Sequence, residues 1–555
     1  MRIALLSDAA TQQFIPVLRS LFSENGVTVD FYEGPFDAIE LEVVNPASGL
    51  YEFKPDVVLL LNSTQALRSR YYEHGIEPEF DRIRRIWDAL ETNSSCRIIQ
   101  CNLPLPYDRP FGQFDLKIQS SLYSGTQALN SHIARIAGER PNVLLCDLEA
   151  VASYVGRRNW FDDRLWDMSK TFCNLDHLPL AAQAMVDLVL AGLGRVVKCV
   201  VLDLDNTLWG GIVGDLGPFG IQLSAHGDGE AFYRFQKYLL SLKKRGILLA
   251  VCSKNDMENA VAPFEQNSGM ALKRDDITVF VANWENKADN IRLIRDTLEI
   301  GFDSMLFLDD NPFERNLVRK FLPEVIVPEL PEDPADYVRT LSELNLFEAT
   351  SFSAEDVARS ALYRQEADRR RAQNSYTDVT EYLKSLDMRI AVARFETRKI
   401  GRIAQLFSRS NQFNLTTHRY SEAQCSVMMQ NERGCIPLQA ILADQFGDHG
   451  LISIVVAWPE GDTLRISDWL MSCRVLGRGV EQYLMNHIFS IARDRGLSTV
   501  RGEYIPTAKN AMVKDFWARF GFENSSESTW EMDVTRYAPQ TVWIREDSSI
   551  GENGR

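Results

Sequence analysis

Two aspartates spaced one residue apart carry the clearest chemistry in this chain. Asp203 and Asp205 follow the apolar residues 199–202 and precede Asn, Thr and, after Leu-Trp, a pair of glycines. The apolar run predicts a buried parallel strand, and open α/β sheets place their ligands at the carboxyl ends of such strands. Side chains at i and i+2 share one face of a strand, so these carboxylates repel each other unless a cation or a proton intervenes. The spacing favours a Mg²⁺ site, and an ordinary polar turn is the simpler alternative.

Three later stretches contain residues that could act together with Asp203 and Asp205. Ser253 ends a second apolar run at 248–253, Lys287 follows in a polar segment, and Asp309 and Asp310 directly follow a third apolar run at 305–308. Helical patterns separate these runs, which is typical of a parallel α/β sheet. The order of acid pair, hydroxyl, lysine and acid pair resembles the four motifs of the haloacid dehalogenase superfamily of phosphotransferases.

This resemblance implies a role for each residue. Asp203 would attack phosphorus and form an aspartyl-phosphate, and Asp205 would protonate the leaving oxygen and later take a proton from water. Ser253 would hydrogen-bond a phosphoryl oxygen, and Lys287 would balance the charge of the phosphate. Mg²⁺ would be held by Asp203, Asp309 and Asp310 and by the backbone carbonyl of Asp205. The intervals 204–252 and 254–286 are too short for a large cap domain, which predicts an open site.

Longer motifs narrow the family. Residues 203–214, 252–255 and 308–315 are similar to the FkbH-like proteins, subfamily IIIC of the haloacid dehalogenase superfamily, and the similarity extends over about 200–534. It implies an enzyme that dephosphorylates the acyl phosphate D-1,3-bisphosphoglycerate. The same enzyme would load the glyceryl unit onto an acyl carrier protein for polyketide-type biosynthesis. A plain phosphatase acting on another phosphate, a CoA-dependent N-acyltransferase fused to a phosphatase, and a non-catalytic scaffold are the alternatives.

The N-terminal segment, residues 1–195, alternates apolar runs with helical patterns. The runs at 3–6, 56–61, 97–102 and 142–147 predict a parallel sheet covered by helices. This layout resembles an SGNH-hydrolase-like domain. Ala9 stands where that family has its nucleophilic serine, and Asn174 stands where the acid of its late Asp-x-x-His element is expected, before His177. Alanine has no hydroxyl to attack an acyl carbon, so we expect an inactive scaffold or docking module.

The C-terminal segment, residues 346–545, contains a glycine-rich loop between a predicted strand at 464–470 and a predicted helix at 480–493. The loop reads Arg474-x-x-Gly477-Arg478-Gly479, and such glycines let a backbone approach a diphosphate at a helix N-terminus. It resembles the acyl-coenzyme-A loop of the GNAT acetyltransferases. The ligand would be coenzyme A or the phosphopantetheine arm of a carrier protein. Further helices are predicted at 353–373, 398–408 and 510–520, and further strands at 438–443, 451–457, 499–503 and 529–534.

One cysteine precedes the glycine-rich loop. Cys473 is predicted to lie between a strand and a helix N-terminus and is flanked by Arg474 and Arg478, features that lower a thiol pKa. The sequence therefore predicts a thiolate that relays the acyl group, with a small packed cysteine as the alternative. Asp444 and His449 could assist this thiol, although turn chemistry explains them equally well.

Composition limits the remaining classes. A chain of 555 residues is too long for one core, so we expect an α/β protein of several domains: 1–195, 196–345, 346–545 and a disordered tail, 546–555. These would be a flavodoxin- or SGNH-like parallel sheet, a haloacid-dehalogenase-like Rossmannoid domain and a GNAT-like mixed domain. The net charge of −16 argues against nucleic acid, and no apolar run is long enough to predict a membrane span. Nine cysteines without metal spacing predict a reduced, cytoplasmic protein. The carrier protein and the oligomeric state stay open.

Overall fold

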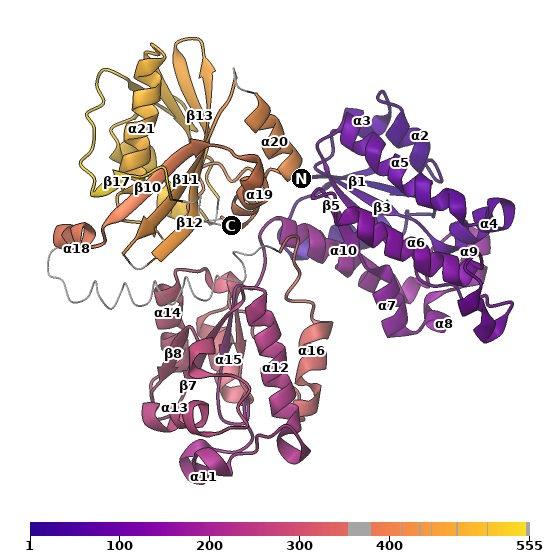
Figure 1. Ribbon diagram of the computed structural model, residues 1–555. Helices are drawn as coiled ribbons and strands as arrows, with labels where there is room; N and C mark the ends of the chain where they lie inside the picture. Colours follow the sequence, from indigo (N-terminus) through magenta and orange to yellow (C-terminus); the bar gives the residue numbers. More distant parts are fainter. Residues whose placement is uncertain are drawn as a thin grey trace. The chain divides into compact units, whose positions relative to one another are not determined.

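The computed structural model describes residues 1–352, 379–410, 412–431, 434–445, 447–472, 475–507 and 509–550 (Figure 1). The predicted helix at 353–373 and the end of the predicted tail, 551–555, lie outside these residues, as do Cys473 and Arg474. The chain divides into two compact units, Met1–Gly192 with Tyr420–Val427, and Leu193–Arg419 with Met428–Arg555. Its three sheets, two wholly parallel and one mixed, confirm the predicted α/β class.

The N-terminal sheet is parallel and has the strand order β2-β1-β3-β4-β5, the doubly wound order predicted for a flavodoxin- or SGNH-like domain. The short edge strand β2 was not predicted. The elements are β1 Arg2–Ser7, α1 Phe14–Glu24, β2 Asp30–Glu33, α2 Ile39–Val44, α3 Gly49–Phe53, β3 Val57–Leu61, α4 Thr64–His74, α5 Glu77–Asn93, β4 Arg97–Cys101, η1 Gly112–Lys117, α6 Leu122–Ala137, β5 Val143–Cys146, α7 Leu148–Val155, α8 Arg157–Trp160, α9 Asp163–Ser169, η2 Leu175–His177 and α10 Leu178–Gly192.

Side-chain alternation along β1 shows why this sheet has helices on both faces. Ile3 and Leu5 pack into one buried cluster with α1 and α10, whereas Ala4 and Leu6 pack into a second cluster with α5 and α6. A strand with both faces buried reads as an almost continuous apolar run. That run is what made the strands of this sheet predictable from the sequence.

The central sheet is also parallel, with the order β8-β7-β6-β9. Leu202 and Leu308 face a cluster that includes α12, whereas Val201 and Phe307 face a cluster that includes α14. The elements are β6 Cys199–Leu202, α11 Val213–Gly220, η3 Gly227–Gly229, α12 Glu230–Lys244, β7 Leu248–Ser253, α13 Met257–Gln266, η4 Arg274–Asp276, β8 Val279–Ala282, α14 Lys287–Leu298, η5 Phe302–Ser304, β9 Met305–Leu308, α15 Pro312–Phe321, η6 Pro334–Asp336 and α16 Tyr337–Glu343.

The C-terminal sheet is mixed, with the order β15-β16-β14-β13-β12-β11-β10-β17. Strands β10 to β13 pair antiparallel, whereas β14 pairs parallel to β13. The elements are α18 Val379–Ser385, β10 Met388–Arg394, η7 Thr397–Lys399, α19 Ile400–Arg409, α20 Glu422–Gln430, β11 Ile436–Asp444, β12 Gly447–Glu460, β13 Thr463–Met471, α21 Val480–Asp494, β14 Thr499–Glu503, η9 Ala511–Val513, α22 Phe516–Arg519, β15 Glu523–Asn524, β16 Thr529–Asp533 and β17 Ile544–Glu546.

One predicted helix of this part was wrong. Residues 510–520 form two short pieces, η9 and α22, in place of a single helix. The indole of Trp517 donates a hydrogen bond to the Glu503 carbonyl, and the ring of Phe516 lies edge-on to Trp469 at 4.9 Å between centroids. These tertiary contacts fix the aromatic residues in a break that local helix propensity does not anticipate. Across the described ranges, no helix combines the length and apolar character needed to cross a membrane.

Candidate active site

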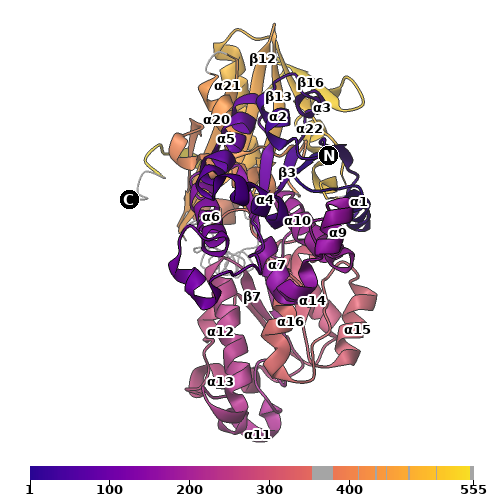
Figure 2. The ribbon, with the colours of Figure 1, turned by 90° about the vertical axis from the view of Figure 1, so that its right-hand side faces the viewer.

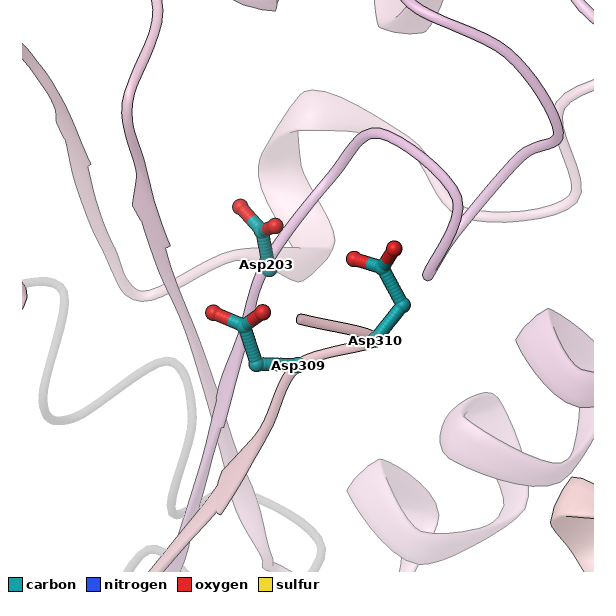
Figure 3. A group of neighbouring side chains, drawn as sticks. All are labelled: Asp203, Asp309 and Asp310. Carbon is teal, nitrogen blue, oxygen red and sulfur yellow. The ribbon is translucent and has the colours of Figure 1, made fainter. Parts of the chain in front are cut away.

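Three carboxylates meet at the carboxyl edge of the central sheet. Strands β6 and β9 are parallel neighbours with Leu202 opposite Leu308, so the residues that follow each strand emerge side by side. The backbone N–H of Asp203 donates to the Leu308 carbonyl at 2.9 Å and extends this pairing. One carboxylate oxygen from each of Asp203, Asp309 and Asp310 lies within 4.8 Å of the others. Figure 3 shows the three side chains gathered at the ends of their strands.

Lys287 lies directly against two of these carboxylates. It opens α14, and the side chain of Asn286 caps that helix by accepting a hydrogen bond from the Ala288 N–H. The Lys287 ammonium lies 3.1 Å from Asp203 and 2.5 Å from Asp309, and the side chain is buried. Burial alone would lower the pKa of Lys287, but the two carboxylates raise it above its ordinary value. The lysine is therefore a fixed positive charge beside the acids.

The single positive charge of Lys287 does not neutralise the three carboxyl groups of Asp203, Asp309 and Asp310. Burial and the neighbouring Asp203 raise the pKa of Asp309 to about 6, and the same causes raise the pKa of Asp310. The Oδ1 atom of Asp203 is buried and has no hydrogen-bond partner among the described residues. An orphaned carboxylate oxygen beside two further carboxylates is a set of hard donors that fits a divalent cation such as Mg²⁺.

Asp205 has different surroundings from the other acids. Its Oδ1 accepts hydrogen bonds from the Trp209 indole at 2.8 Å and from the Val213 N–H at 3.0 Å, and its Oδ2 accepts one from the Asn255 amide at 3.1 Å. Burial raises the pKa of Asp205 above its ordinary value. The side chain is held in one orientation by three donors, which suits a group that must give and take a proton. Sequence reasoning missed the holding roles of Trp209 and Asn255, although both lie within the quoted motifs.

The loop that carries Asp309 and Asp310 is fixed by two further residues that sequence reasoning also missed. The buried hydroxyl of Thr207 accepts a hydrogen bond from the Asp310 N–H at 3.1 Å. The Arg315 guanidinium donates to the carbonyls of Asp309 and Asp310 at 2.8 and 2.7 Å. Both contacts orient backbone groups, so they position the carboxylates without touching them.

Ser253 ends β7, which is the neighbour of β6 on the side away from β9. Its side chain is almost fully buried, and it lies at the same carboxyl edge as Asp203. Between Asp203 and Ser253 the chain adds only α11 and η3 before α12. Figures 1 and 2 both show α11 beside α13, and the two helices contact each other. The predicted absence of a large cap is confirmed, although α11 itself was not anticipated.

The glycine-rich loop of the C-terminal part is only partly described. Gly477 and Gly479 have φ values of 72° and 85°, a left-handed backbone that the missing side chain permits. Arg478 is buried and turned inward, with its guanidinium 3.3 Å from His449 and 3.6 Å from Asp444. His449 in turn hydrogen-bonds with Asp444 at 2.9 Å. The predicted residues Cys473 and Arg474 lie outside the described residues, so the thiol relay stays a prediction.

The N-terminal part has a buried alanine where a hydrolase would need a hydroxyl, directly after a buried acid. Ala9 is buried at the end of β1, and Asp8 accepts a hydrogen bond from the Ser63 N–H and pairs with Arg70. The side chain of Asn174 caps the short 3₁₀ helix that carries His177. Asp8 and Asn174 therefore have structural partners, and the lack of hydrolase activity stays a prediction.

Comparison with known proteins identifies the family to which the chain belongs. Its central part is a haloacid-dehalogenase-like α/β domain by sheet order and by its paired acids. The family described as FkbH, N-terminal domain, matches residues 2–190. The N-terminal part of the protein BF1531 from Bacteroides fragilis, which contains a phosphatase domain and was crystallised with Mg, is 42% identical. That match covers 63% of this chain and 95% of the other, with a TM-score of 0.61. The chain belongs to the FkbH-like family.

Weaker similarity links the chain to N-acetyltransferases. The ribosomal-protein-S18-alanine N-acetyltransferase from Escherichia coli is 14% identical, and PaiA from Thermoplasma acidophilum, solved with coenzyme A, is 12% identical. These matches cover 27% and 26% of this chain and 98% of each enzyme, with TM-scores of 0.21. A search of curated proteins found no match to this chain.

The binding of Mg²⁺ should strengthen as the pH rises, because the ion competes with a proton on the acid cluster. The pKa of Asp309 in the folded protein, about 6, is higher than in the unfolded chain. The carboxyl group of Asp309 therefore binds its proton more tightly in the folded state than in the unfolded state. This proton binding stabilises the metal-free folded protein at low pH, and the stabilisation is lost as the pH rises through 6. Mg²⁺ competes with that proton, so we expect Mg²⁺ to raise the Tm more at pH 7 than at pH 5. Thermal melts with Mg²⁺ or with EDTA measure this difference.

A matched pair of variants separates the cluster from general ionic effects. Asp309→Asn should lose the Mg²⁺-dependent rise in Tm at both pH values. Asp296→Asn, at an exposed aspartate of α14, should keep it. An equal rise at pH 5 and pH 7 in the unmodified protein would show that Asp309 does not hold the ion.

Proposed function

We propose that this protein is a Mg²⁺-dependent phosphatase and acyl transferase. It would dephosphorylate an acyl phosphate of the 1,3-bisphosphoglycerate type and load the glyceryl unit onto an acyl carrier protein. The observation that carries the phosphatase half is the buried cluster of Asp203, Asp309 and Asp310 against Lys287. The transferase half rests on membership of the FkbH-like family and on the resemblance stated for its motifs.

Phosphate transfer follows from the positions of two aspartates. A carboxylate oxygen of Asp203 attacks the phosphorus of the 3-phosphate, and the ester bond from that phosphorus to the glyceryl oxygen breaks, so the acyl phosphate is kept for the acyl transfer. Asp205, when protonated, gives its proton to that leaving oxygen. Water then attacks the aspartyl-phosphate, Asp205 takes a proton from it, and inorganic phosphate leaves with Asp203 restored. The raised pKa of Asp205 favours its protonated form at the start of this cycle.

The other residues of the site would bind the metal ion or stabilise the negative charge of the phosphoryl group. Asp203, Asp309 and Asp310 would bind Mg²⁺, which, when bound, neutralises charge on the phosphoryl oxygens. Lys287 supplies a second fixed positive charge beside Asp203, and Ser253 would donate a hydrogen bond to a phosphoryl oxygen. Thr207 and Arg315 keep the loop of the acid pair in position through its backbone.

Acyl transfer would use a different residue. We assign the relay to Cys473, whose thiolate would attack the acyl carbon of the acyl phosphate and release its phosphate. The phosphopantetheine thiol of the carrier protein would then take the glyceryl group from the cysteine thioester. Both steps exchange one leaving group for one nucleophile, so no oxidant or reductant is needed.

A plain phosphatase is the second candidate. The hydrogen bonds and ion pairs described for the acid cluster come from residues 203–315, and none of them involves the C-terminal part. Phosphomonoester hydrolysis therefore needs no carrier protein, and a sugar phosphate or another phosphate could be the substrate.

Intact mass spectrometry decides between these candidates. The protein is incubated with D-1,3-bisphosphoglycerate, Mg²⁺ and a panel of carrier proteins, and both proteins are weighed. We expect one carrier to gain a glyceryl group. Cys473→Ala should abolish this gain and leave the Mg²⁺-dependent removal of the 3-phosphate intact, whereas Cys435→Ala, at a buried cysteine that directly precedes β11, should change neither. Phosphate release with no glyceryl group on any carrier would favour the plain phosphatase. Loading by Cys473→Ala at the unmodified rate would mean direct transfer.

A further inference from the structure

The GNAT-like fold of the C-terminal part implies coenzyme A, so the fit of that cofactor can be tested against the residues present. Two features would have to receive it. One is the glycine-rich loop before α21, whose backbone N–H groups could bind a diphosphate. The other is the gap between β13 and β14, because the parallel pairing of these strands runs only from Thr463 with Thr499 to Ile466 with Gly502. Beyond that point the facing strand edges could bind an extended amide chain such as pantetheine.

The gap between β13 and β14 is filled by the chain itself. The Leu415 N–H donates to the Trp469 carbonyl at 3.0 Å, and the Phe413 carbonyl accepts from the Met471 N–H at 3.0 Å. On the opposite side the Leu415 carbonyl accepts from the Ile505 N–H at 2.8 Å. Residues 413–415 thus bridge the two diverging strands and use the backbone groups that a pantetheine arm would need.

This inserted segment belongs to the protein core. Phe413 and Leu415 are 2% and 1% exposed and lie in the main cluster of the C-terminal part. The buried amide of Asn510 donates to the Asn414 carbonyl at 2.9 Å, and the Thr416 hydroxyl donates to Asp468 at 3.1 Å. Removing the segment would expose this apolar surface and leave buried polar groups without partners, which costs several kcal/mol.

The glycine-rich loop also has an internal anion. Glu481 lies in the first turn of α21, where its side chain lines a cavity beside Gly477 and Gly479. Arg519 lines the same cavity of about 470 Å³, so a carboxyl group and a guanidinium are both present at this helix end. Arg478, the basic residue among the described residues of the loop, is turned toward His449 and Asp444. A diphosphate placed here would meet a negative charge and a donor that is already used.

We infer that the C-terminal part has kept the GNAT-like fold but does not take coenzyme A, because residues 413–415 occupy the place of its pantetheine arm and the Glu481 carboxyl group lines the place of its diphosphate. The inference does not depend on the proposed phosphatase reaction. It removes the coenzyme-A-dependent acetyltransferase from the candidate functions. It also means that the pantetheine arm of a carrier protein must enter by a route other than the β13–β14 gap.

Calorimetric titration of the full chain tests this inference. The ligands are coenzyme A and 3′-phospho-ADP, which has the same diphosphate but no pantetheine arm. We expect no saturable binding of either ligand to the unmodified protein. Glu481→Gln removes the charge in the loop and should increase the affinity for 3′-phospho-ADP at least about tenfold. Coenzyme A should bind this variant no more tightly than 3′-phospho-ADP, because the gap is still filled.

The control is Glu527→Gln, at an exposed glutamate that does not line the cavity. It should behave as the unmodified protein does. Saturable binding of coenzyme A to the unmodified protein, tighter than that of 3′-phospho-ADP, would overturn the inference whether or not the Glu481 variant folds. A folded Glu481→Gln protein that gains no affinity for 3′-phospho-ADP would overturn the role of Glu481. Carrier loading is measured separately, so failure here does not decide the proposed function.

Discussion

Replacing Asp203 by asparagine is expected to abolish phosphate release while leaving the fold intact. Asparagine keeps the shape of the side chain, but its amide cannot attack phosphorus or form the acyl-phosphate bond. Removal of a covalent nucleophile typically lowers kcat by about 10⁴ to 10⁶. The measurement is Mg²⁺-dependent release of inorganic phosphate, with the Tm and the circular dichroism spectrum recorded to confirm folding.

Asp289→Asn is a suitable control for this loss. Asp289 lies in the first turn of α14, is exposed, and forms an ion pair with Arg292 of the same helix. Its variant should release phosphate at the unmodified rate. If Asp203→Asn retained turnover within about tenfold of the unmodified protein, covalent catalysis at Asp203 would be excluded.

Lys287→Met should have the second largest effect, and it should change stability as well as rate. The lysine is the charged partner of Asp203 and Asp309 in a buried place, and its loss leaves acids that repel each other. Removing one member of a buried ion pair costs about 3–5 kcal/mol of unfolding free energy. Loss of one preorganised charge at a reacting phosphate lowers kcat by about 10² to 10³.

The stability of this variant should depend more strongly on Mg²⁺ than that of the unmodified protein. A bound cation would replace part of the charge that the lysine supplied, so the rise in Tm with Mg²⁺ should be larger. Lys320→Met, at a lysine of α15 that is not part of the acid cluster, should match the unmodified protein in both measurements. A Lys287→Met protein with normal kcat and normal Tm would contradict the charge-balance argument.

The sheets of the first two parts could be predicted because their strands are buried on both faces. Residues such as Ile3 to Leu6 and Cys199 to Leu202 are continuous apolar runs, and a run of that kind is a strong signal in a sequence. The acid pairs directly follow such runs, so their convergence at one sheet edge could be predicted as well. The edge strands β2 and β8 were missed because they are short and only partly buried.

The residues that hold the acids could not be predicted in these roles. Asn255 reaches Asp205 from the next strand along the sheet, and Arg315 reaches back to the carbonyls of Asp309 and Asp310 from α15. Such contacts depend on side-chain orientation in the folded protein, which periodicity does not report. In the same way, the sequence contains the stretch around Phe413 but does not show that this stretch bridges β13 and β14.

The glycine-rich loop shows how a local motif can mislead. Its glycines have the left-handed backbone expected of an anion-binding loop. The residues that decide whether an anion enters are Glu481, within the next helix, and the distant pair of Asp444 and His449, which engages Arg478. A motif predicts backbone shape, whereas ligand choice depends on charges brought in from elsewhere in the fold.

The most direct test of the proposed phosphate chemistry is to trap the phosphorylated enzyme. The protein is mixed with substrate and Mg²⁺, quenched in acid within the first turnover, digested, and analysed by peptide mass spectrometry. The account predicts a mass increase of one phosphoryl group on the peptide that contains Asp203, and no such increase in Asp203→Asn. Steady release of phosphate with no phosphorylated peptide, or with the phosphoryl group on a different residue, would contradict it.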